Sequence, residues 1–265
     1  MGADVALDTP LHPLAKAMLE RGLLAGIRFY VPDHAHQTVL DRHASETAAA
    51  PGQLRRWSEA PETTLHVSVS STVTEDTPEA MTIVICEHVN RGQLGTSRST
   101  LVVHDMLPPV GNESLKTMFL EWFNQPDTPV ACATKGGYWC SMSDVVGAFI
   151  RLLPSVKVDN KTYHVCGRRF WTMADTRSEF LALAERTQAG LTGRFAAHHL
   201  MSDRMDPIAL EGVETTDDRP DRPDIAPFHR QLESLTGEGW RPTMPLRQSL
   251  MLVLAELSQL NEEVR

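Results

Sequence analysis

The sequence lacks three features that mark common functional classes. Its four cysteines form no C-x-x-C pair, which argues against a zinc knuckle or a redox dithiol and predicts reduced, buried thiols. It has no sustained apolar run and no basic segment at its start, so we expect no membrane span, no secretory signal and a cytoplasmic location. It has no basic stripe and a net charge of −9, which argues against nucleic acid or an anionic membrane as partner.

The first 31 residues predict a strand, a helix and a second strand. Val5 and Leu7 fit a short buried strand. The helix has one apolar stripe at i, i+3, i+4, i+7 spacing, formed by Leu11, Leu14, Ala15, Met18 and Leu19. Thr9-Pro10 is predicted to cap this helix and Gly22 to end it. A strand at residues 25–31 follows, and we expect it to run parallel to the first because a helix joins them.

The turn between the first strand and this helix, Asp8–Pro13, contains no glycine. Glycine normally lets a dinucleotide's pyrophosphate come within contact distance of the backbone at such a turn. Its absence argues against a dinucleotide cradle. We therefore expect the turn to be one wall of a substrate pocket, with contacts from the side chains of Asp8 and His12.

The remaining elements can be placed by periodicity. Further strands are predicted at 64–70, 99–104, 128–132, 138–141 and 161–166. Helices are predicted at 112–124, 145–153, 172–189 and 245–260, with one or two more between 37 and 62. Residues 78–91 fit either a strand at 81–86 or a helix, and we favour the helix. Together these elements predict an α/β fold with a parallel sheet flanked by helices.

Four segments of the second half form a recognisable series. They are YWCSMSDVVGAFI at 138–150, KTYHVCG at 161–167, Thr172 with the helix after it, and GWRP at 239–242. Their order resembles that of the extended short-chain dehydrogenase/reductases, the group of NAD-dependent sugar-nucleotide epimerases and dehydratases. In the first half, residues 102–111 resemble the family's strand and loop beside the nicotinamide and substrate. Residues 64–73 resemble the strand with its catalytic serine or threonine.

This resemblance covers nearly the whole chain and implies a domain organisation. We expect a Rossmann-like core over residues 1–125. A small substrate-side lobe over residues 126–265 is expected to be interleaved with that core. The lobe would include an exposed acidic loop at 203–224, which is rich in Asp, Pro and Thr.

The chain departs from the family in three places. The glycine-rich turn is absent from residues 5–11. The family's proton-transferring tyrosine is followed four residues later by lysine, whereas His34, Met142 and Gly167 follow Tyr30, Tyr138 and Tyr163. The stretch from Val31 to Thr64 is too short for the strands and helices usual there, so we expect a sheet truncated on its adenine side. These losses together argue against NAD(P) redox chemistry, and we expect no cofactor.

Polar residues follow several of the predicted strands. In an open parallel sheet the ligand lies beyond the carboxyl ends of the strands, so we expect these residues to line a site. The expected substrate contacts are Asp8, His12, Asp33, His34 and Thr72, with Trp139 and Met142 facing them from the lobe.

The catalytic candidates are His104, Asp105, Ser70 and Ser71. His104 is the candidate general acid or base, because imidazole titrates near neutral pH and Asp105 could hold its tautomer. The alternative is a histidine bonded to loop backbone. By the family resemblance, Ser70 and Ser71 could donate to a developing oxyanion; alternatively they cap the strand end.

Other chemistry has weaker support. His34 and His36 with Asp33 could hold a metal, but solvent-facing loop histidines are far commoner, and we expect no metal. The chain has no G-x-S-x-G elbow, which argues against a hydrolase of that type. Cys140 lies within a predicted strand, which argues against its use as a nucleophile.

We predict a cofactor-independent enzyme on a short-chain dehydrogenase scaffold. Its reaction would be isomerisation, elimination or cyclisation of a small polar or polyketide-like metabolite, in secondary metabolism. One alternative is an NAD(P)-dependent sugar-nucleotide epimerase or reductase with divergent motifs. Another is a non-catalytic relative that binds a metabolite or a partner. The apolar face of the last helix is expected to pack on the lobe. A homodimer through this helix is a further possibility.

Overall fold

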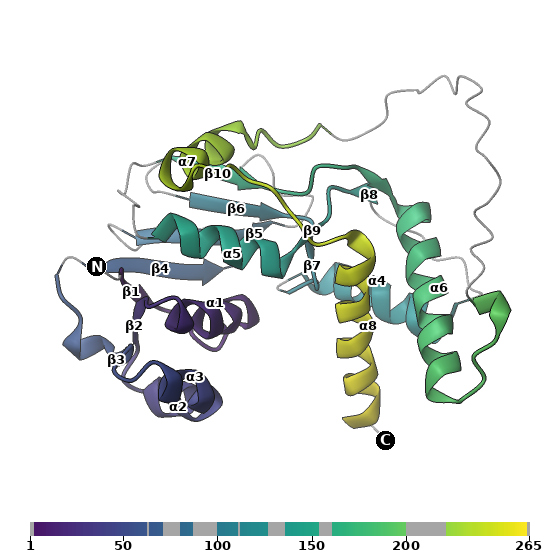
Figure 1. Ribbon diagram of the computed structural model, residues 1–265, viewed down its shortest axis with the longest axis horizontal. Helices are drawn as coiled ribbons and strands as arrows, with labels where there is room; N and C mark the ends of the chain where they lie inside the picture. The colour runs from purple at the N-terminus through teal and green to yellow at the C-terminus, as the bar shows by residue number, and fades with distance from the viewer. Residues whose placement is uncertain are drawn as a thin grey trace.

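A central sheet of parallel strands organises the chain. The computed structural model describes residues 3–62, 64–70, 80–86, 100–110, 112–126, 136–153, 161–199 and 221–263. Its seven-stranded sheet has the order β10-β6-β5-β4-β1-β2-β3, and all neighbours are parallel (Figure 1). The strands are β1 (Asp4–Leu7), β2 (Arg28–Val31), β3 (Leu54–Arg56), β4 (Leu65–Ser70), β5 (Ala80–Cys86), β6 (Thr100–His104) and β10 (Thr162–Val165). The predicted parallel sheet flanked by helices is confirmed.

Helices and short strands complete the described chain. The helices are α1 (Pro13–Leu24), α2 (His36–Arg42), α3 (Ala44–Ala49), α4 (Glu113–Asn124), α5 (Met142–Leu152), α6 (Met173–Leu191), α7 (Ala226–Thr236) and α8 (Leu246–Glu263). Short 3-10 helices are η1 (Trp57–Glu59) and η3 (Ala197–His199). Two small pairs are β7 (Met106–Leu107) with β9 (Cys140–Ser141), and β8 (Gly136–Gly137) with β11 (Trp171–Thr172). No described helix is long and apolar enough to cross a membrane.

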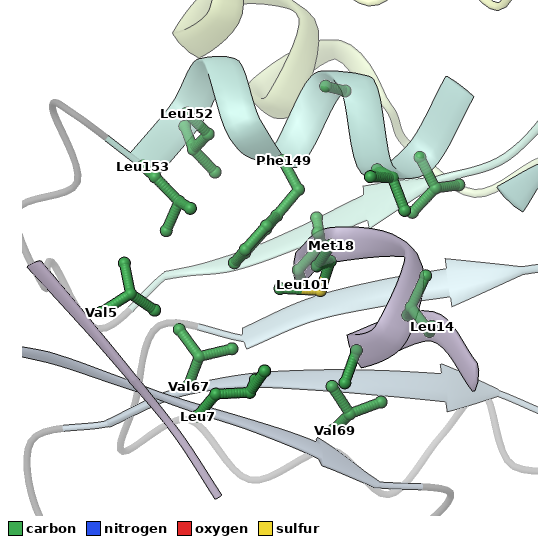
Figure 2. Packing of buried hydrophobic residues seen from close by; sticks show 14 of the residues in the cluster. Val5, Leu7, Leu14, Met18, Val67, Val69, Leu101, Phe149, Leu152 and Leu153 are labelled. Carbon is green, nitrogen blue, oxygen red and sulfur yellow. The ribbon is translucent and has the colours of Figure 1, made fainter. Parts of the chain in front are cut away.

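One face of the sheet is apolar and carries the main core. Side chains from β1, β4 and β6 point from the sheet toward α1 and α5, where Met18 and Phe149 meet them (Figure 2). Gly22 is required inside α1 because a Cβ there would overlap the ring of Phe29 on β2. The prediction that Gly22 ends the helix is wrong, because α1 continues to Leu24.

The other face of the sheet is polar in several places. Because side chains alternate along a strand, the neighbours of the core residues point to this face. They include Tyr30 on β2, His66 and Ser68 on β4, and Thr100 and His104 on β6. Doubly covered parallel strands normally read as continuous apolar runs, so this alternation is unusual for the fold.

A second core lies beyond the carboxyl ends of the strands, where α4, α6 and α8 gather (Figure 1). Phe119, Trp122 and Phe180 form its aromatic centre, with ring centroids 5.1–6.0 Å apart. The inward face of α8 adds four buried side chains, Leu250, Val253, Leu254 and Leu257. The last helix therefore packs through its apolar stripe on α4 and α6, whereas the division into a core and a lobe stays a prediction.

The expected truncation between Val31 and Thr64 is wrong. This stretch holds α2, α3 and a further strand, β3, which pairs with β2. The strand escaped prediction because Leu54 is the one apolar residue in a segment that is otherwise polar and short. The sheet keeps two strands on this side of β1, so the missing motifs are not explained by a missing part of the sheet.

Two local predictions are also corrected. Residues 80–86 form the strand β5 and not the favoured helix. Their sequence, Ala-Met-Thr-Ile-Val-Ile-Cys, is typical of a central strand, but periodicity alone does not distinguish such a strand from a buried helix. Helix α5 begins at Met142, and its N-cap is Ser141, whose hydroxyl accepts from the Ser143 N–H at 3.1 Å. The helices predicted at 112–124, 172–189 and 245–260 are confirmed within three residues at each end.

Some predictions fall outside the described residues. They are the sites at Ser71 and Thr72, the strand at 128–132, and residues 203–220 of the acidic loop.

Candidate functional site

The turn between β1 and α1 is bonded to the neighbouring strand β4. The Thr9 hydroxyl donates to the Val69 carbonyl at 3.3 Å and accepts from the Val69 N–H at 3.2 Å. The Asp8 N–H donates to the Val67 carbonyl at 3.1 Å. The turn therefore continues the strand pairing beyond the end of β1 and is fixed by its own side chain.

His12 caps α1, where the sequence had suggested Thr9-Pro10. Its Nδ1 accepts from the Leu14 N–H at 3.2 Å, and Pro13 occupies the first turn, where it supplies no N–H. The His12 N–H in turn donates to the Thr9 carbonyl at 3.1 Å. Two donors at the helix N-terminus, the N–H groups of His12 and Leu14, are thus engaged by the chain itself.

The fold implies a nicotinamide dinucleotide, and the turn does not fit one. A pyrophosphate binds to free N–H groups at this helix N-terminus, over glycines that let it approach. Here the N–H groups of Asp8, His12 and Leu14 bond to protein acceptors, Pro10 and Pro13 have none, and every position carries a Cβ. We therefore derive no chemical step through this cofactor.

A pocket of about 410 Å³ lies beside the turn, and we call it the α4–α8 pocket. It lies between the start of α1, the loop that follows β7, and the helices α4 and α8. Its lining residues are His12, Pro13, Pro109, Val110, Glu113, Lys116, Phe119, Val253, Glu256 and Leu257. It lies beyond the carboxyl end of β1, next to the point where the strand order reverses, which is where open α/β sheets bind ligands.

Two acid/base groups of this pocket have shifted pKa values. Desolvation raises the pKa of Glu256, and Lys116 opposes the shift. Glu256 as a residue is exposed, so the shift reflects partial enclosure of its carboxyl group rather than full burial. Desolvation lowers the pKa of His12, so this imidazole favours its neutral form.

The cap also fixes the tautomer of His12. A backbone N–H can only donate, so the Nδ1 that receives the Leu14 N–H has no proton. In neutral His12 the proton is therefore on Nε2, which is a hydrogen-bond donor. The pocket thus combines a neutral imidazole donor, the Lys116 cation and two carboxyl groups, and the described structure gives no hydrogen bond to the side chains of Glu113, Lys116 or Glu256.

Asp8 lies outside the α4–α8 pocket and interacts electrostatically with His66 of β4. Desolvation raises its pKa, and His66 of β4 partly opposes the shift. Its Oδ1 is buried without a hydrogen-bond partner among the described residues. The indole of Trp57 lies 5.2 Å from the His66 ring. Asp8 does not line the α4–α8 pocket.

The predicted pair His104 and Asp105 make hydrogen-bond contacts with other parts of the protein. His104 is 2% exposed, and its Nε2 lies 2.9 Å from the Nδ1 of His164 on β10. Asp105 has a left-handed backbone, with φ of 50°, and its Oδ2 accepts from the Tyr138 N–H at 2.7 Å. Neither residue lines the α4–α8 pocket, so a catalytic role for this pair stays a prediction.

The other predicted contacts are spread over the molecule. Asp33 is exposed and accepts from the N–H and hydroxyl of Ser58, and His34 is exposed beside it. Trp139 lies in the second core, where its Nε1 donates to the Thr176 hydroxyl at 2.9 Å, and Met142 packs against the main core. Of the predicted site residues whose side chains the structure describes, His12 alone lines the α4–α8 pocket.

The two helices that complete the pocket, α4 and α8, were not predicted to belong to the site. Glu113 and Lys116 come from α4 and Glu256 from α8, far from the strand ends that topology pointed to. One signal was available: Glu256 lies beside the apolar stripe of α8, between Val253 and Leu257. Within the described residues, no three His, Cys, Asp or Glu side chains are grouped to hold a metal ion.

Comparisons with known proteins show the fold. No protein-family model and no curated protein sequence matches this chain. Among solved structures, it is similar to the terminal R domain of the myxalamid PKS-NRPS biosynthetic pathway, at 11% identity and a TM-score of 0.55, covering 97% of this chain and 91% of that chain. It is also similar to yeast methylglyoxal/isovaleraldehyde reductase complexed with NADPH, at 7% identity and a TM-score of 0.54, covering 97% and 99%.

A third similar structure is a reductase engineered for asymmetric catalysis, at 8% identity and a TM-score of 0.53, covering 97% of this chain and all of that chain. At these identities the likeness concerns the fold alone. The chain has the Rossmann-like fold of the extended short-chain dehydrogenase/reductases, so the resemblance found in the sequence is confirmed at the level of the fold.

Proposed function

We propose that this protein moves a proton on a small carbonyl metabolite bound in the α4–α8 pocket, without a dinucleotide. The observation that carries the proposal is the bond from the Leu14 N–H to His12 Nδ1, which leaves Nε2–H as a donor in the same pocket as Glu256. A volume of about 410 Å³ suits a small metabolite.

The chemistry assigns one role to each group. The carboxylate of Glu256 removes a proton from the carbon next to the carbonyl, and its raised pKa makes it a stronger base than an ordinary glutamate. The Nε2–H of neutral His12 donates to the carbonyl oxygen as it gains charge. A neutral histidine whose pKa is lowered by its surroundings is a known way to polarise a carbonyl group.

Lys116 stabilises the negative charge of the enolate, or of a carboxylate elsewhere on the ligand. Returning the proton from Glu256 to a different carbon isomerises the substrate. Alternatively, a leaving group on the neighbouring carbon departs with its bonding electrons and takes the proton from Glu256, while the enolate collapses to an unsaturated carbonyl compound; this is elimination. The walls formed by Phe119, Val253 and Leu257 exclude water from the apolar part of the ligand.

The experiment measures deuterium incorporation from D2O into a panel of small β-keto acids and β-keto esters by mass spectrometry. We expect the wild type to catalyse exchange at the acidic carbon of at least one compound. Glu256→Gln should lower that rate by about 10²–10⁴-fold, the usual contribution of a general base. Glu121→Gln, which removes an exposed carboxylate of α4 outside the pocket, is the matched control.

The alternatives give different results. Exchange or reduction that requires added NADPH would favour a reductase or epimerase with divergent motifs. The similar yeast reductase, whose structure contains NADPH, is the reason to test this alternative. A compound that raises the melting temperature but undergoes no exchange in the wild type would contradict the enzyme proposal and favour a binding protein.

A further inference from the structure

A second pocket, at the start of α7, is strongly basic, and we call it the arginine pocket. Its volume is about 550 Å³. The lining residues are Arg168, Arg222, Pro223, Asp224, Ile225, Ala226, His229 and Arg230. The described lining thus includes three arginines, one histidine and one aspartate, in a chain whose net charge is −9. The pocket shares no lining residue with the α4–α8 pocket, so its ligand is independent of the proposed function.

The arginines of this pocket are not neutralised by the described chain. The structure gives Arg222 and Arg230 no ion pair with a described residue, and both side chains are exposed. Arg168 makes one hydrogen bond, from Nη2 to the Trp240 carbonyl at 3.4 Å. Like charges that outnumber the carboxylate beside them repel one another, and an anionic ligand would reduce that repulsion.

Asp224, the one carboxylate among the described lining residues, has a structural role. Asp224 Oδ1 accepts from the Ala226 N–H at 2.9 Å, at the N-terminus of α7. Pro227 in the first turn has no N–H to offer a ligand. The anion affinity of the pocket therefore comes from its side chains and not from the end of the helix.

His229 is held in a fixed orientation. Its Nδ1 lies 3.3 Å from the Trp240 carbonyl, which can only accept, so Nδ1 carries a proton. A Cβ at position 239 would overlap the imidazole, so Gly239 allows the ring to lie there. Arg168 and His229 thus share one backbone anchor, the Trp240 carbonyl, and present a preorganised edge to the pocket.

We propose that the arginine pocket binds a small ligand that carries a diphosphate group. Among the described lining residues, three guanidinium groups and one carboxylate give a net charge of +2, which matches a diphosphate better than a single phosphate. Guanidinium groups bind phosphate oxygens through paired N–H donors, and three of them supply donors for two phosphate groups. The volume accommodates a small molecule rather than a macromolecular surface.

The test is calorimetry with inorganic pyrophosphate and inorganic phosphate as separate probes. We expect pyrophosphate to bind at least about tenfold more tightly than phosphate, with an affinity that falls as salt is raised. Arg222→Ala and Arg230→Ala should each weaken pyrophosphate by about tenfold, the usual effect of losing a charge-assisted contact. Arg222→Lys, which keeps the charge but loses the paired donors, should weaken it less.

Arg194→Ala removes the same charge from an exposed arginine outside the pocket and should leave binding unchanged. Circular dichroism of each variant checks that the fold is intact. Equal affinity for the two probes would overturn the diphosphate assignment. Absence of binding by the wild type, or binding that survives the double substitution Arg222→Ala and Arg230→Ala, would overturn the site itself.

Discussion

The β1–α1 turn and the α4–α8 pocket lie side by side, and they use their polar groups in opposite ways. In the turn, the Thr9 hydroxyl, the His12 Nδ1 and the N–H of Asp8 all bond to the chain. In the pocket, Glu113, Lys116 and Glu256 have no hydrogen bond from the described residues. Polar groups that the chain satisfies stabilise the fold, whereas polar groups that it leaves open are available to a ligand.

His12 belongs to both regions, because one ring nitrogen caps α1 and the ring also lines the pocket. This double position links the end of α1 to the pocket through one side chain. The helix N-terminus that would hold a pyrophosphate is stabilised by the protein itself. The pocket lies beside this helix N-terminus, at the end of the sheet.

The largest expected change in the free energy of unfolding comes from Phe119, which lines the pocket and is also part of the second core. Phe119 is fully buried and packs on Trp122 and Phe180. Phe119→Ala should lower the free energy of unfolding by about 3–5 kcal/mol, because it leaves a cavity. Leu191→Ala, at a side chain that is 75% exposed, is the control and should change little. Urea unfolding measures both, and a small loss at Phe119 would mean that the pocket is not built on the core.

The next effect tests whether the turn is bonded as described. Thr9→Val keeps the shape of the side chain but removes both hydrogen bonds to Val69. We expect a loss of about 1–3 kcal/mol in the free energy of unfolding, since the backbone groups of Val69 lose this partner. Thr38→Val, at an exposed position of α2, is the control. If the two variants were equally stable, the turn would not owe its conformation to Thr9.

Two substitutions separate the two roles of His12. His12→Ala should cost about 0.5–2 kcal/mol of stability through loss of the cap, whereas His12→Asn restores a capping acceptor and should recover most of it. Both variants remove the imidazole from the pocket, so both should lose the proposed proton transfer. Thermal unfolding and deuterium exchange, measured on the same samples, would show whether the roles are separable. Activity that follows stability in both variants would argue that His12 acts only as a cap.

The smallest effect is a dependence of stability on pH. The pKa of Glu256 is raised above its ordinary value of 4.5, so the native state binds more protons than the unfolded state between that value and the raised one. Stability should therefore fall as pH rises through this window. Glu256→Gln should remove this part of the slope, as measured by urea unfolding at several pH values. A slope of opposite sign that depends on Glu256 would contradict the shift.

Much of the fold could be predicted from the sequence, because strands such as 99–104 and the helices near 112–124 and 245–260 have clear apolar periods. The strand β3 could not be predicted, since its pairing with β2 and not its composition defines it. At the site, His12 was found because topology places it after the first strand. Glu113, Lys116 and Glu256 were missed because tertiary packing of α4 and α8, which no local pattern encodes, brings them to the pocket.

Calorimetric titration with NADPH and NAD+ tests most directly whether the β1–α1 turn has lost its capacity to hold a dinucleotide. We expect no binding of either nucleotide by the wild type at millimolar concentration, because the turn has no glycine and the N–H groups of Asp8, His12 and Leu14 are already bonded to protein acceptors. Micromolar binding of NADPH that is weakened by a substitution at His12 would place the cofactor at this helix N-terminus and contradict that loss.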